Sequence, residues 1–231
     1  LILLTRGPAD FEAFESTLHF DGTRGAIHRV TRRWELMNTR YLLGAAAYLE
    51  ALNNQLDPEL KRFRIAMLFD FYQTREGGPI LVRTNATGPF ALFEFGGALP
   101  RAKLYANWQV STNDEATLAR LASKEYDPAQ TVLVADTIQP SAATNQNTGT
   151  VEFTSYAPKH IVLRAKASAA SVLLLNDRYQ PGWRVTVDGK PAALLRCNYV
   201  MRGVQLPAGE HTVAFEFKPP LKGLYVSLSA I

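Results

Sequence analysis

Apolar residues recur at steps of three and four in two segments near the start of the chain. Phe11, Phe14 and Leu18 share one side of a helix predicted over residues 11–18. A second helix is predicted over residues 26–37, with Ile27, Val30, Trp34 and Met37 on one side and Arg29, Arg32 and Arg33 on the other. Both segments are expected to pack an apolar face on a core and to leave the polar face in water.

One further helix and several strands are predicted before residue 137. Thr112 and Glu115 have the spacing of a capping box, which predicts a helix over residues 112–124. Short apolar runs bounded by Gly and Pro predict strands over residues 40–44, 80–83, 91–95, 102–110 and 131–135. This part of the chain is therefore expected to form a mixed α/β unit.

After Gly149 the pattern changes to strands alone. Seven segments alternate or run apolar at strand length: residues 151–156, 161–167, 171–176, 183–188, 192–198, 200–206 and 210–218. The pair Asp188-Gly189 between two of them is a strong hairpin signal. Many short strands in succession predict an antiparallel β-sandwich, of the Ig-like or jelly-roll kind.

The expected fold class is α+β, with the mixed α/β unit over residues 1–140 and the β-sandwich over residues 150–222. A stretch rich in Ser, Ala, Thr, Asn and Gln joins them. Residues 223–231 turn apolar after Pro219-Pro220. They are read either as an element packed on the body or as the first turns of a truncated transmembrane helix. We expect the 231 residues to be a piece of a larger protein.

Composition narrows the class of protein. Hydrophobic residues make up 47% and charged residues 20%, as in ordinary folded domains. Cys197 is the single cysteine, so an internal disulfide and a zinc site with two thiolates are excluded, and a buried apolar role is expected for it. The net charge of +4 permits anionic partners without requiring them. Nucleic acid is not expected as a partner, because the basic residues are not interleaved with aromatic residues on one sheet face.

The chain contains no local catalytic motif. A phosphate-binding loop, a dinucleotide fingerprint and a nucleophile elbow are all absent from the sequence. The four histidines are scattered, without metal-ligand spacing. We therefore expect no catalytic residue, no metal and no cofactor. Asp188 is expected to serve the hairpin turn, and His211 to be a hydrogen-bonded structural residue.

Two groups of residues are candidates for ligand binding. Asp177, Arg178, Tyr179 and Trp183 place aromatic faces beside polar groups, which suits a sugar ring; the alternative for Trp183 is an anchor in the sandwich core. Arg29, Arg32 and Arg33 could contact a phosphate, either of a lipid headgroup or of a lipid-linked sugar. The alternative for these arginines is the solvated face of a helix.

The same region carries a family resemblance. It contains Asp-x-Tyr-x-Pro-Gly-Trp at Asp177–Trp183, Val-Asp-Gly at Val187–Gly189, Arg-x-Asn-Tyr-x-x-Arg at Arg196–Arg202 and Pro-Ala-Gly-x-His at Pro207–His211. In this order the motifs resemble the C-terminal extracytoplasmic region of bacterial YfhO-like membrane proteins. The match is specific over about fifty residues, and the segment Trp34–Leu43 is similar to a further segment of that family.

The resemblance implies a polytopic membrane protein of the GT-C glycosyltransferase type, which uses a polyprenyl-phosphate sugar to modify cell-surface glycans. Its catalytic carboxylates lie in the transmembrane half, so no catalytic role is carried onto this chain, and whether the full-length protein is an enzyme stays open. We expect a non-catalytic domain on the extracytoplasmic (periplasmic) face of the bacterial cytoplasmic membrane. Transmembrane segments outside this chain would attach it, and it would contact acceptor glycan or lipid-linked sugar. The alternative is a purely structural or protein-interaction module with no small-molecule ligand.

Overall fold

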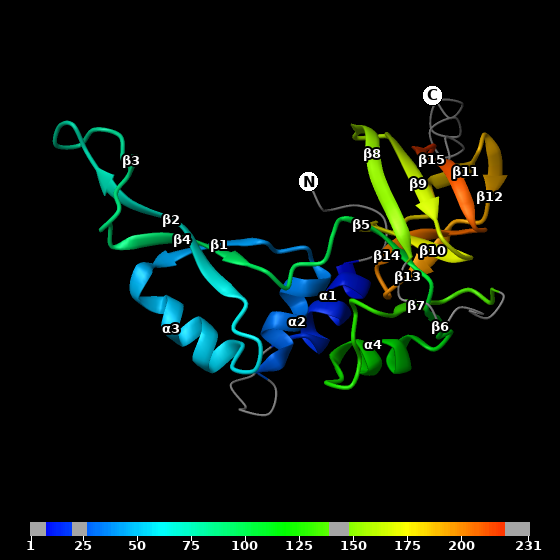
Figure 1. Cartoon of the computed structure of the whole chain (residues 1–231), viewed down its shortest axis with the longest axis horizontal. Helices are drawn as coiled ribbons and strands as arrows, with labels where there is room; N and C mark the ends of the chain where they lie inside the picture. The colour runs from blue at the N-terminus through cyan, green and yellow to red at the C-terminus, as the bar shows by residue number, and fades with distance from the viewer. Residues whose placement is uncertain (1–7, 20–26, 139–147, 220–231) are drawn as a thin grey trace, which may run out of the picture. The chain divides into compact units, whose positions relative to one another are not determined.

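The computed structural model describes residues 8–19, 27–138 and 148–219, which are mostly β-strand (Figure 1). The chain divides into a small unit, Leu18–Leu99, and a large unit made of Leu1–Thr17 with Pro100–Ile231. This division differs from the predicted one at residues 140–150. Strands from residues 102–134 lie in the same sheet as strands from residues 171–206, and hydrogen bonds therefore join the two sides of the predicted boundary. Residues 223–231, with the predicted helix start, lie outside the described residues.

The small unit is built on one antiparallel sheet, which we call sheet A. Its strands in spatial order are β1 (Tyr41–Ala45), β4 (Phe90–Phe95), β2 (Phe63–Tyr72) and β3 (Leu81–Thr84). Its helical segments are α2 (His28–Leu36) and a continuous stretch of η2 (Ala46–Tyr48), α3 (Leu49–Ala51) and η3 (Leu52–Leu56). Figure 1 shows this stretch along one face of the sheet.

The core of the small unit lies on the face of sheet A that the helical segments cover. Phe63, Phe93 and Phe95 are buried there, and the rings of Phe63 and Phe95 stack with centroids 4.8 Å apart. Trp34 of α2 meets both stacked rings edge-on, at 5.8 and 6.0 Å. Strand β2 was not predicted, because its sequence, FRIAMLFDFY, shows neither clean alternation nor a turn signal at its start.

The orientation predicted for α2 is right for Trp34, which packs on the core rings, but wrong for Arg32. The buried residues of the helix are Thr31, Arg32, Glu35 and Leu36, whereas Trp34 and Val30 are only half-buried. Arg32 is buried because Glu35 accepts a hydrogen bond from its Nε at 3.0 Å, so that the charge enters the interior as an ion pair. A pattern based on hydrophobicity alone cannot detect paired charges on a buried face.

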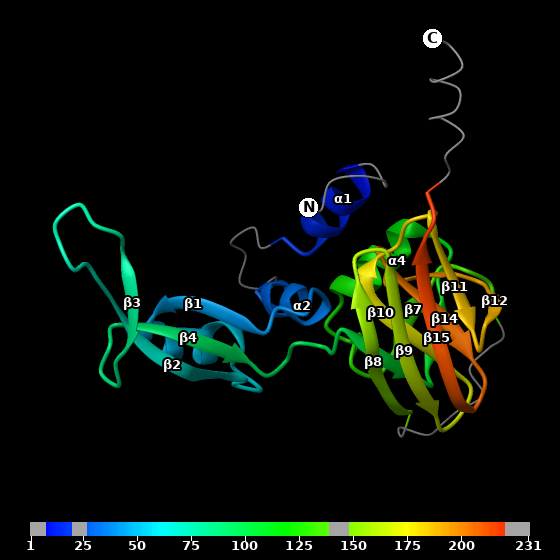
Figure 2. The ribbon, with the colours of Figure 1, turned by 90° about the horizontal axis from the view of Figure 1, so that it is seen from above.

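The large unit contains two sheets. Sheet B has the order β5 (Ala102–Tyr105), β10 (Ser171–Arg178), β14 (Met201–Leu206), β13 (Leu195–Cys197), β7 (Val132–Val134) and β6 (Trp108–Val110). Sheet C has the order β12 (Lys190–Ala192), β11 (Trp183–Val187), β15 (Gly209–Phe217), β9 (His160–Ala167) and β8 (Gly149–Ala157). Every pairing is antiparallel except that of β6 with β7, which is parallel. Figure 2 shows β8, β9, β15 and β11 side by side.

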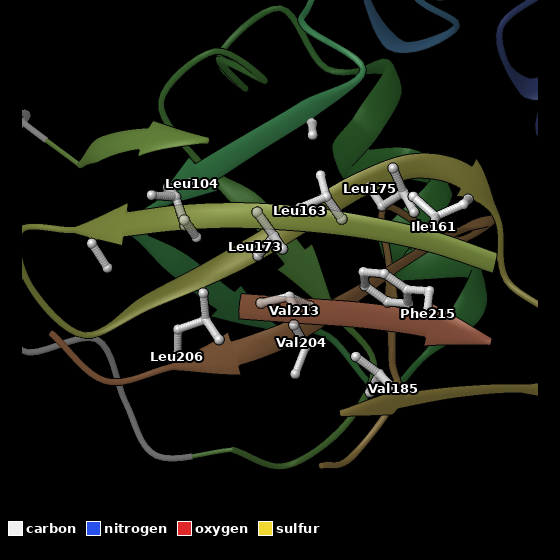
Figure 3. Packing of buried hydrophobic residues seen from close by; sticks show 13 residues of the cluster. Leu104, Ile161, Leu163, Leu173, Leu175, Val185, Val204, Leu206, Val213 and Phe215 are labelled. Atoms are coloured by element: carbon white, nitrogen blue, oxygen red, sulfur yellow. The ribbon is translucent and has the colours of Figure 1, made fainter. Parts of the chain in front are cut away.

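Sheets B and C share one hydrophobic core (Figure 3). Sheet B contributes Leu104, Leu173, Leu175, Val204 and Leu206, and sheet C contributes Ile161, Leu163, Val185, Val213 and Phe215. Strand β9 alternates buried residues with half-buried or exposed ones from Ile161 to Ala167, as expected for a strand with one face on a core. The predominance of antiparallel sheets is thus established, while the Ig-like or jelly-roll assignment stays a prediction.

Sheet B is also covered on its second face. Residues 171–175 of β10 are all buried, which fits a strand with both faces inside. Helix α4 (Asp114–Ala122) supplies the buried Leu121 to this unit and contacts α1 (Pro8–Thr17), whose Phe14 is fully buried. The cap of α4 is Asn113, whose Oδ1 accepts from the Ala116 backbone N–H at 2.8 Å, so the capping box expected at Thr112 and Glu115 is corrected by one position.

Two predicted strands are each divided in the structure. Residues 102–110 form β5 and β6, on opposite edges of sheet B, and residues 192–198 cross from β12 in sheet C to β13 in sheet B. The hairpin predicted at Asp188-Gly189 is confirmed: β11 pairs with β12 across it, and both turn residues have positive φ, 52° and 75°.

Candidate functional site

The candidate site is arranged around Asp177, at the end of β10. The register of β10 with β14 shifts between Leu175 and Arg178, so the chain bulges at Asn176 and Asp177. Such a bulge redirects a side chain relative to the flat ladder. The backbone is tied down on both sides, because the Asn176 N–H donates to the Arg101 carbonyl and the Tyr179 N–H to the Val200 carbonyl, both at 2.7 Å.

Two arginines bind the Asp177 carboxylate. Arg101 reaches Oδ1 through Nε and a terminal nitrogen at 3.1 and 2.8 Å, and Arg202 reaches Oδ2 at 2.8 Å. The two cations share one carboxylate, so the cluster carries an excess positive charge. Partial burial lowers the pKa of Arg101, but its interactions with Asp177, together with Tyr156, outweigh burial and raise it.

Arg202 is the buried member of the cluster. Its guanidinium carbon lies 3.8 Å from the ring centroid of Trp183, and a terminal nitrogen donates to the Arg178 carbonyl at 3.0 Å. Its Nε is buried without a hydrogen-bond partner among the described residues. Burial lowers the pKa of Arg202 to about 10, with Asp177 opposing the shift, so the side chain stays charged at neutral pH.

Arg101 forms the solvent-facing side of the cluster. Its side chain is 47% exposed, and its guanidinium carbon lies 4.4 Å from the ring centroid of Tyr156, whose hydroxyl it also contacts. Tyr156 is itself half-exposed and meets Phe153 edge-on at 5.7 Å. Both rings come from the edge strand β8, opposite Ile161 and Leu163 in the ladder, so they lie on the inner side of sheet C.

The structure brings together two of the four residues predicted for glycan binding. Asp177 and Trp183 are linked through Arg202, while Arg178 contributes its carbonyl and Tyr179 its backbone N–H. Both aromatic side chains, Tyr179 and Trp183, are half-buried. Trp183 packs against the shared core and meets Phe217 at 5.4 Å, so the core alternative accounts for part of its surface.

Sequence reasoning missed Arg101 and Tyr156 as site residues. Leu99–Ala102, which contains Arg101, resembles a segment of the YfhO-like family, but no motif assigns either residue to a site, because β5 and β8 reach Asp177 only through the pairing of distant segments. Arg202 could have been found, since it is the last residue of the Arg-x-Asn-Tyr-x-x-Arg pattern. In the same pattern, Asn198 and Tyr199 both have positive φ, and the Asn198 amide oxygen accepts from the Leu133 N–H at 3.0 Å, which indicates a structural turn.

The expected structural roles of Asp188, His211 and Cys197 are confirmed. Asp188 binds His211 Nδ1 and accepts from the Thr212 N–H, both at 2.8 Å, and these contacts lower the pKa of Asp188. Asp188 is therefore occupied within its hairpin. Cys197 is fully buried, and burial raises the pKa of its thiol, so it is not a reactive thiolate.

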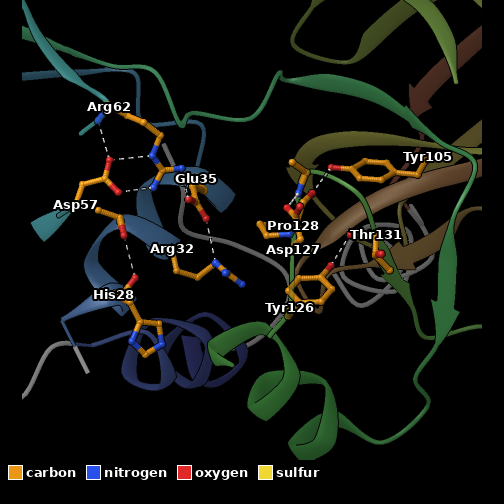
Figure 4. A network of polar contacts seen from close by, with 12 residues as sticks. His28, Arg32, Glu35, Asp57, Arg62, Tyr105, Tyr126, Asp127, Pro128 and Thr131 are labelled. Atoms are coloured by element: carbon orange, nitrogen blue, oxygen red, sulfur yellow. Dashed lines mark hydrogen bonds and ion pairs between the residues drawn. The ribbon is translucent and has the colours of Figure 1, made fainter. Parts of the chain in front are cut away.

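Arg32 and Arg62 of the small unit belong to one ion-pair network (Figure 4). Arg32 binds Glu35, Glu35 also binds Arg62 at 2.7 Å, and Arg62 binds Asp57 at 2.9 Å. The Arg32 side chain is only 10% exposed, so it forms no solvated face. Arg29 and Arg33 are half-buried, and a phosphate site at Arg29, Arg32 and Arg33 stays a prediction.

The part of the chain that the structure describes contains neither a metal-ligand cluster nor a membrane-spanning helix. In residues 8–19, 27–138 and 148–219, no group of three or more His, Cys, Asp and Glu side chains is arranged to hold a metal ion. Over those same residues, no helix is long and apolar enough to cross a membrane.

Comparison with known proteins identifies one region of the chain. No curated protein and no solved structure matches it significantly. Residues 130–229 match the family model described as the bacterial membrane protein YfhO. This match contains Asp177, Trp183 and Arg202 but not Arg101, so most of the cluster lies within it. The region from residue 130 to residue 229 is YfhO-like, as its sequence motifs predicted.

Proposed function

We propose that the large unit is a non-catalytic domain of a bacterial membrane protein resembling GT-C glycosyltransferases, on the extracytoplasmic face of the membrane. In this proposal it contacts a glycan, either the acceptor or a lipid-linked sugar, beside Asp177. One observation carries the proposal: the half-exposed ring of Tyr156 lies under the Arg101 guanidinium, which Asp177 holds in place.

The chemistry of this arrangement suits a sugar. An aromatic ring provides an apolar surface for the C–H face of a pyranose, and adjacent charged groups can bind its hydroxyls. Arg101 presents guanidinium N–H groups to solvent at a position fixed by two hydrogen bonds to Asp177. A side chain held in advance loses less conformational freedom when a ligand binds. Arg202 and Trp183 support the site from beneath in this proposal.

The alternative is a structural module without a ligand. The burial of Arg202 and its stacking on Trp183 favour this alternative for the inner half of the cluster, because these contacts serve packing as well as recognition. The outer half of the cluster, Tyr156 and Arg101, distinguishes a glycan-binding domain from a structural module. Tyr156 and Arg101 are too exposed to contribute much to stability, so a strong effect of Tyr156 on binding would require a ligand.

Glycan-array binding by the chain tests the proposal, with Tyr156→Ala and Tyr156→Phe variants. Alanine removes the ring and phenylalanine keeps it, so binding is expected to be lost in the first and largely kept in the second. Val110→Ala is the matched control, since Val110 is similarly exposed on β6 of sheet B. If Tyr156→Ala leaves specific glycan binding unchanged, Tyr156 is not part of the binding site. Absence of binding to any glycan would favour the structural module.

A further inference from the structure

Sheet A has a second apolar face, opposite the face that carries its core. Residues directly across an antiparallel ladder point to the same side. Leu43 of β1 lies opposite Leu92 of β4, which in turn lies opposite Met67 of β2. Ala45 lies opposite Phe90, which lies opposite Phe69. Phe71, two residues after Phe69 on the same side of β2, lies opposite Val82 of β3. We call this side, made of Tyr41, Leu43, Met67, Phe69, Phe71, Val82, Phe90 and Leu92, the open face.

Much of the open face is in contact with solvent. Leu43, Phe71 and Val82 are 73%, 50% and 55% exposed, and Tyr41 and Met67 are exposed as well, whereas Phe90 and Leu92 are half-buried and Phe69 is buried. The rings of Phe71 and Phe90 lie 4.8 Å apart, and Phe71 also meets Phe69 at 5.3 Å, so the aromatic part is continuous. Single exposed apolar residues are common on soluble proteins, whereas a contiguous set on one sheet face marks an interaction surface.

The exposed charges on the open face are positive. Arg40 and Arg64 extend there with side chains 61% and 75% exposed, and both bind Glu94. The Glu94 side chain is only 9% exposed, because it lies beneath the two guanidinium groups. Hydrogen bonding by Arg40, with Arg64, holds the pKa of Glu94 below its usual range, so this carboxylate stays charged. Among the strand residues that point to this side, Glu94 is the acidic one, and the exposed charge is therefore positive.

We propose that the open face binds the surface of a bilayer that contains anionic phospholipids. Aliphatic and aromatic side chains would enter the acyl boundary, and Tyr41 would lie at headgroup level. Arg40 and Arg64 would meet the lipid phosphates, to which guanidinium groups bind through paired hydrogen bonds. The inference takes the membrane setting of the proposed function, but it does not depend on glycan binding by the large unit.

Charge favours lipid over a second copy of the chain. In a twofold dimer the same patch meets itself, so Arg40 and Arg64 of both copies would approach one another. Glu94, the carboxylate that both arginines bind on this face, lies beneath them and is already bound within its own copy. Like charges brought together without a counterion oppose association. An anionic lipid surface provides the missing counter-charge together with an apolar interior.

Vesicle flotation tests the proposal with the whole chain. We expect binding to vesicles of phosphatidylcholine with phosphatidylglycerol, and weaker binding to phosphatidylcholine alone or at high salt. Leu43→Asp combined with Val82→Asp should lower binding about tenfold or more, since two apolar contacts are lost and two anions are added. The control is Leu60→Asp, because Leu60 is 64% exposed in the same unit but outside sheet A. Near-ultraviolet circular dichroism verifies that each variant is folded.

Three outcomes would overturn the lipid proposal. The first is a wild-type chain that does not float with anionic vesicles, and the second is an equal loss of binding in Leu60→Asp. The third is a dimer in sedimentation analysis that Leu43→Asp with Val82→Asp abolishes, which would assign the open face to a second copy. Tyr156→Ala should leave flotation unchanged, so failure of the glycan proposal and failure of the lipid proposal are read separately.

Discussion

The sheets of the large unit and sheet A of the small unit bury their apolar residues to different extents. In the large unit, the alternating residues of β9 and β15 place one side in the core that sheets B and C share, and polar residues such as Arg164 and Glu216 lie outward. In sheet A the side without helices is also rich in apolar residues, from Leu43 to Val82. The large unit thus completes its own packing, whereas sheet A keeps an apolar side in solvent.

The difference distinguishes apolar residues that stabilise the fold from apolar residues that are available for interaction. A buried apolar side chain stabilises its own fold, and the same side chain left in water contributes little until something covers it. The shared core of the large unit and the open face of the small unit should therefore respond differently to the same substitution. Apolar truncation should reduce stability in the shared core and surface binding on the open face.

The largest expected effect contrasts Phe215 with Phe71. Phe215 is fully buried between sheets B and C, so Phe215→Ala should lower the free energy of unfolding by about 3–5 kcal/mol. Phe71 is half-exposed, and Phe71→Ala should change it by only about 0.5 kcal/mol. Urea unfolding followed by circular dichroism measures both. Similar losses for the two variants would contradict the view that the open face is not part of a core.

A second contrast concerns the two arginine clusters. Arg202→Ala would leave Asp177 with Arg101 alone and uncover Trp183, and it should cost about 3 kcal/mol in unfolding free energy. Arg64→Ala removes an arginine that is 75% exposed and leaves Arg40 on Glu94, so its cost should stay below about 1 kcal/mol. An Arg202 variant as stable as the wild type would mean that the buried cluster serves only recognition.

The smallest effect is the acid sensitivity of the small unit. Burial alone would raise the pKa of Asp57, but its hydrogen bonds to Arg62 outweigh this and lower it, so the folded state holds the charged form more strongly. This contribution is complete above the unfolded pKa of about 3.9 and is lost as the pH falls through the lower folded value. We expect a loss of about 1 kcal/mol below pH ~4, discounted for solvent screening. Thermal melts of Asp57→Asn should show a weaker pH dependence than wild type; an unchanged slope would exclude Asp57 as the cause.

The sequence predicts the strands of the large unit well, because their periodicity is simple. β9 and β15 alternate, β10 is a continuous apolar run, and Asp188-Gly189 marks a turn. It fails at β2, where residues 65–69 are apolar on both faces and the register shifts between Ile65 and Met67, so that no single period describes it. It also fails at α2, whose buried face includes the ion pair of Arg32 and Glu35.

The candidate site was predicted only where its residues lie in one motif. Asp177 and Trp183 belong to the same short stretch, and the structure links them through Arg202. Arg101 and Tyr156 come from strands whose pairing depends on long-range packing. No local pattern contains information on which strand will lie beside β10, and therefore a site assembled across strands is recovered only in part.

The position of β5 in sheet B has a consequence for how the large unit is made. Its Tyr105 pairs with Val172 of β10, and β10 must then pair with β14, so the centre of the sheet is built from its latest strands. During synthesis the apolar residues of β5 are finished long before their partners exist. Chain closure over such separations slows folding. The apolar residues of β5 therefore stay unpaired, and open to aggregation, until β14 has been synthesised as far as Leu206. A local hairpin such as β2–β3 has no such delay, because its two strands are synthesised one after the other.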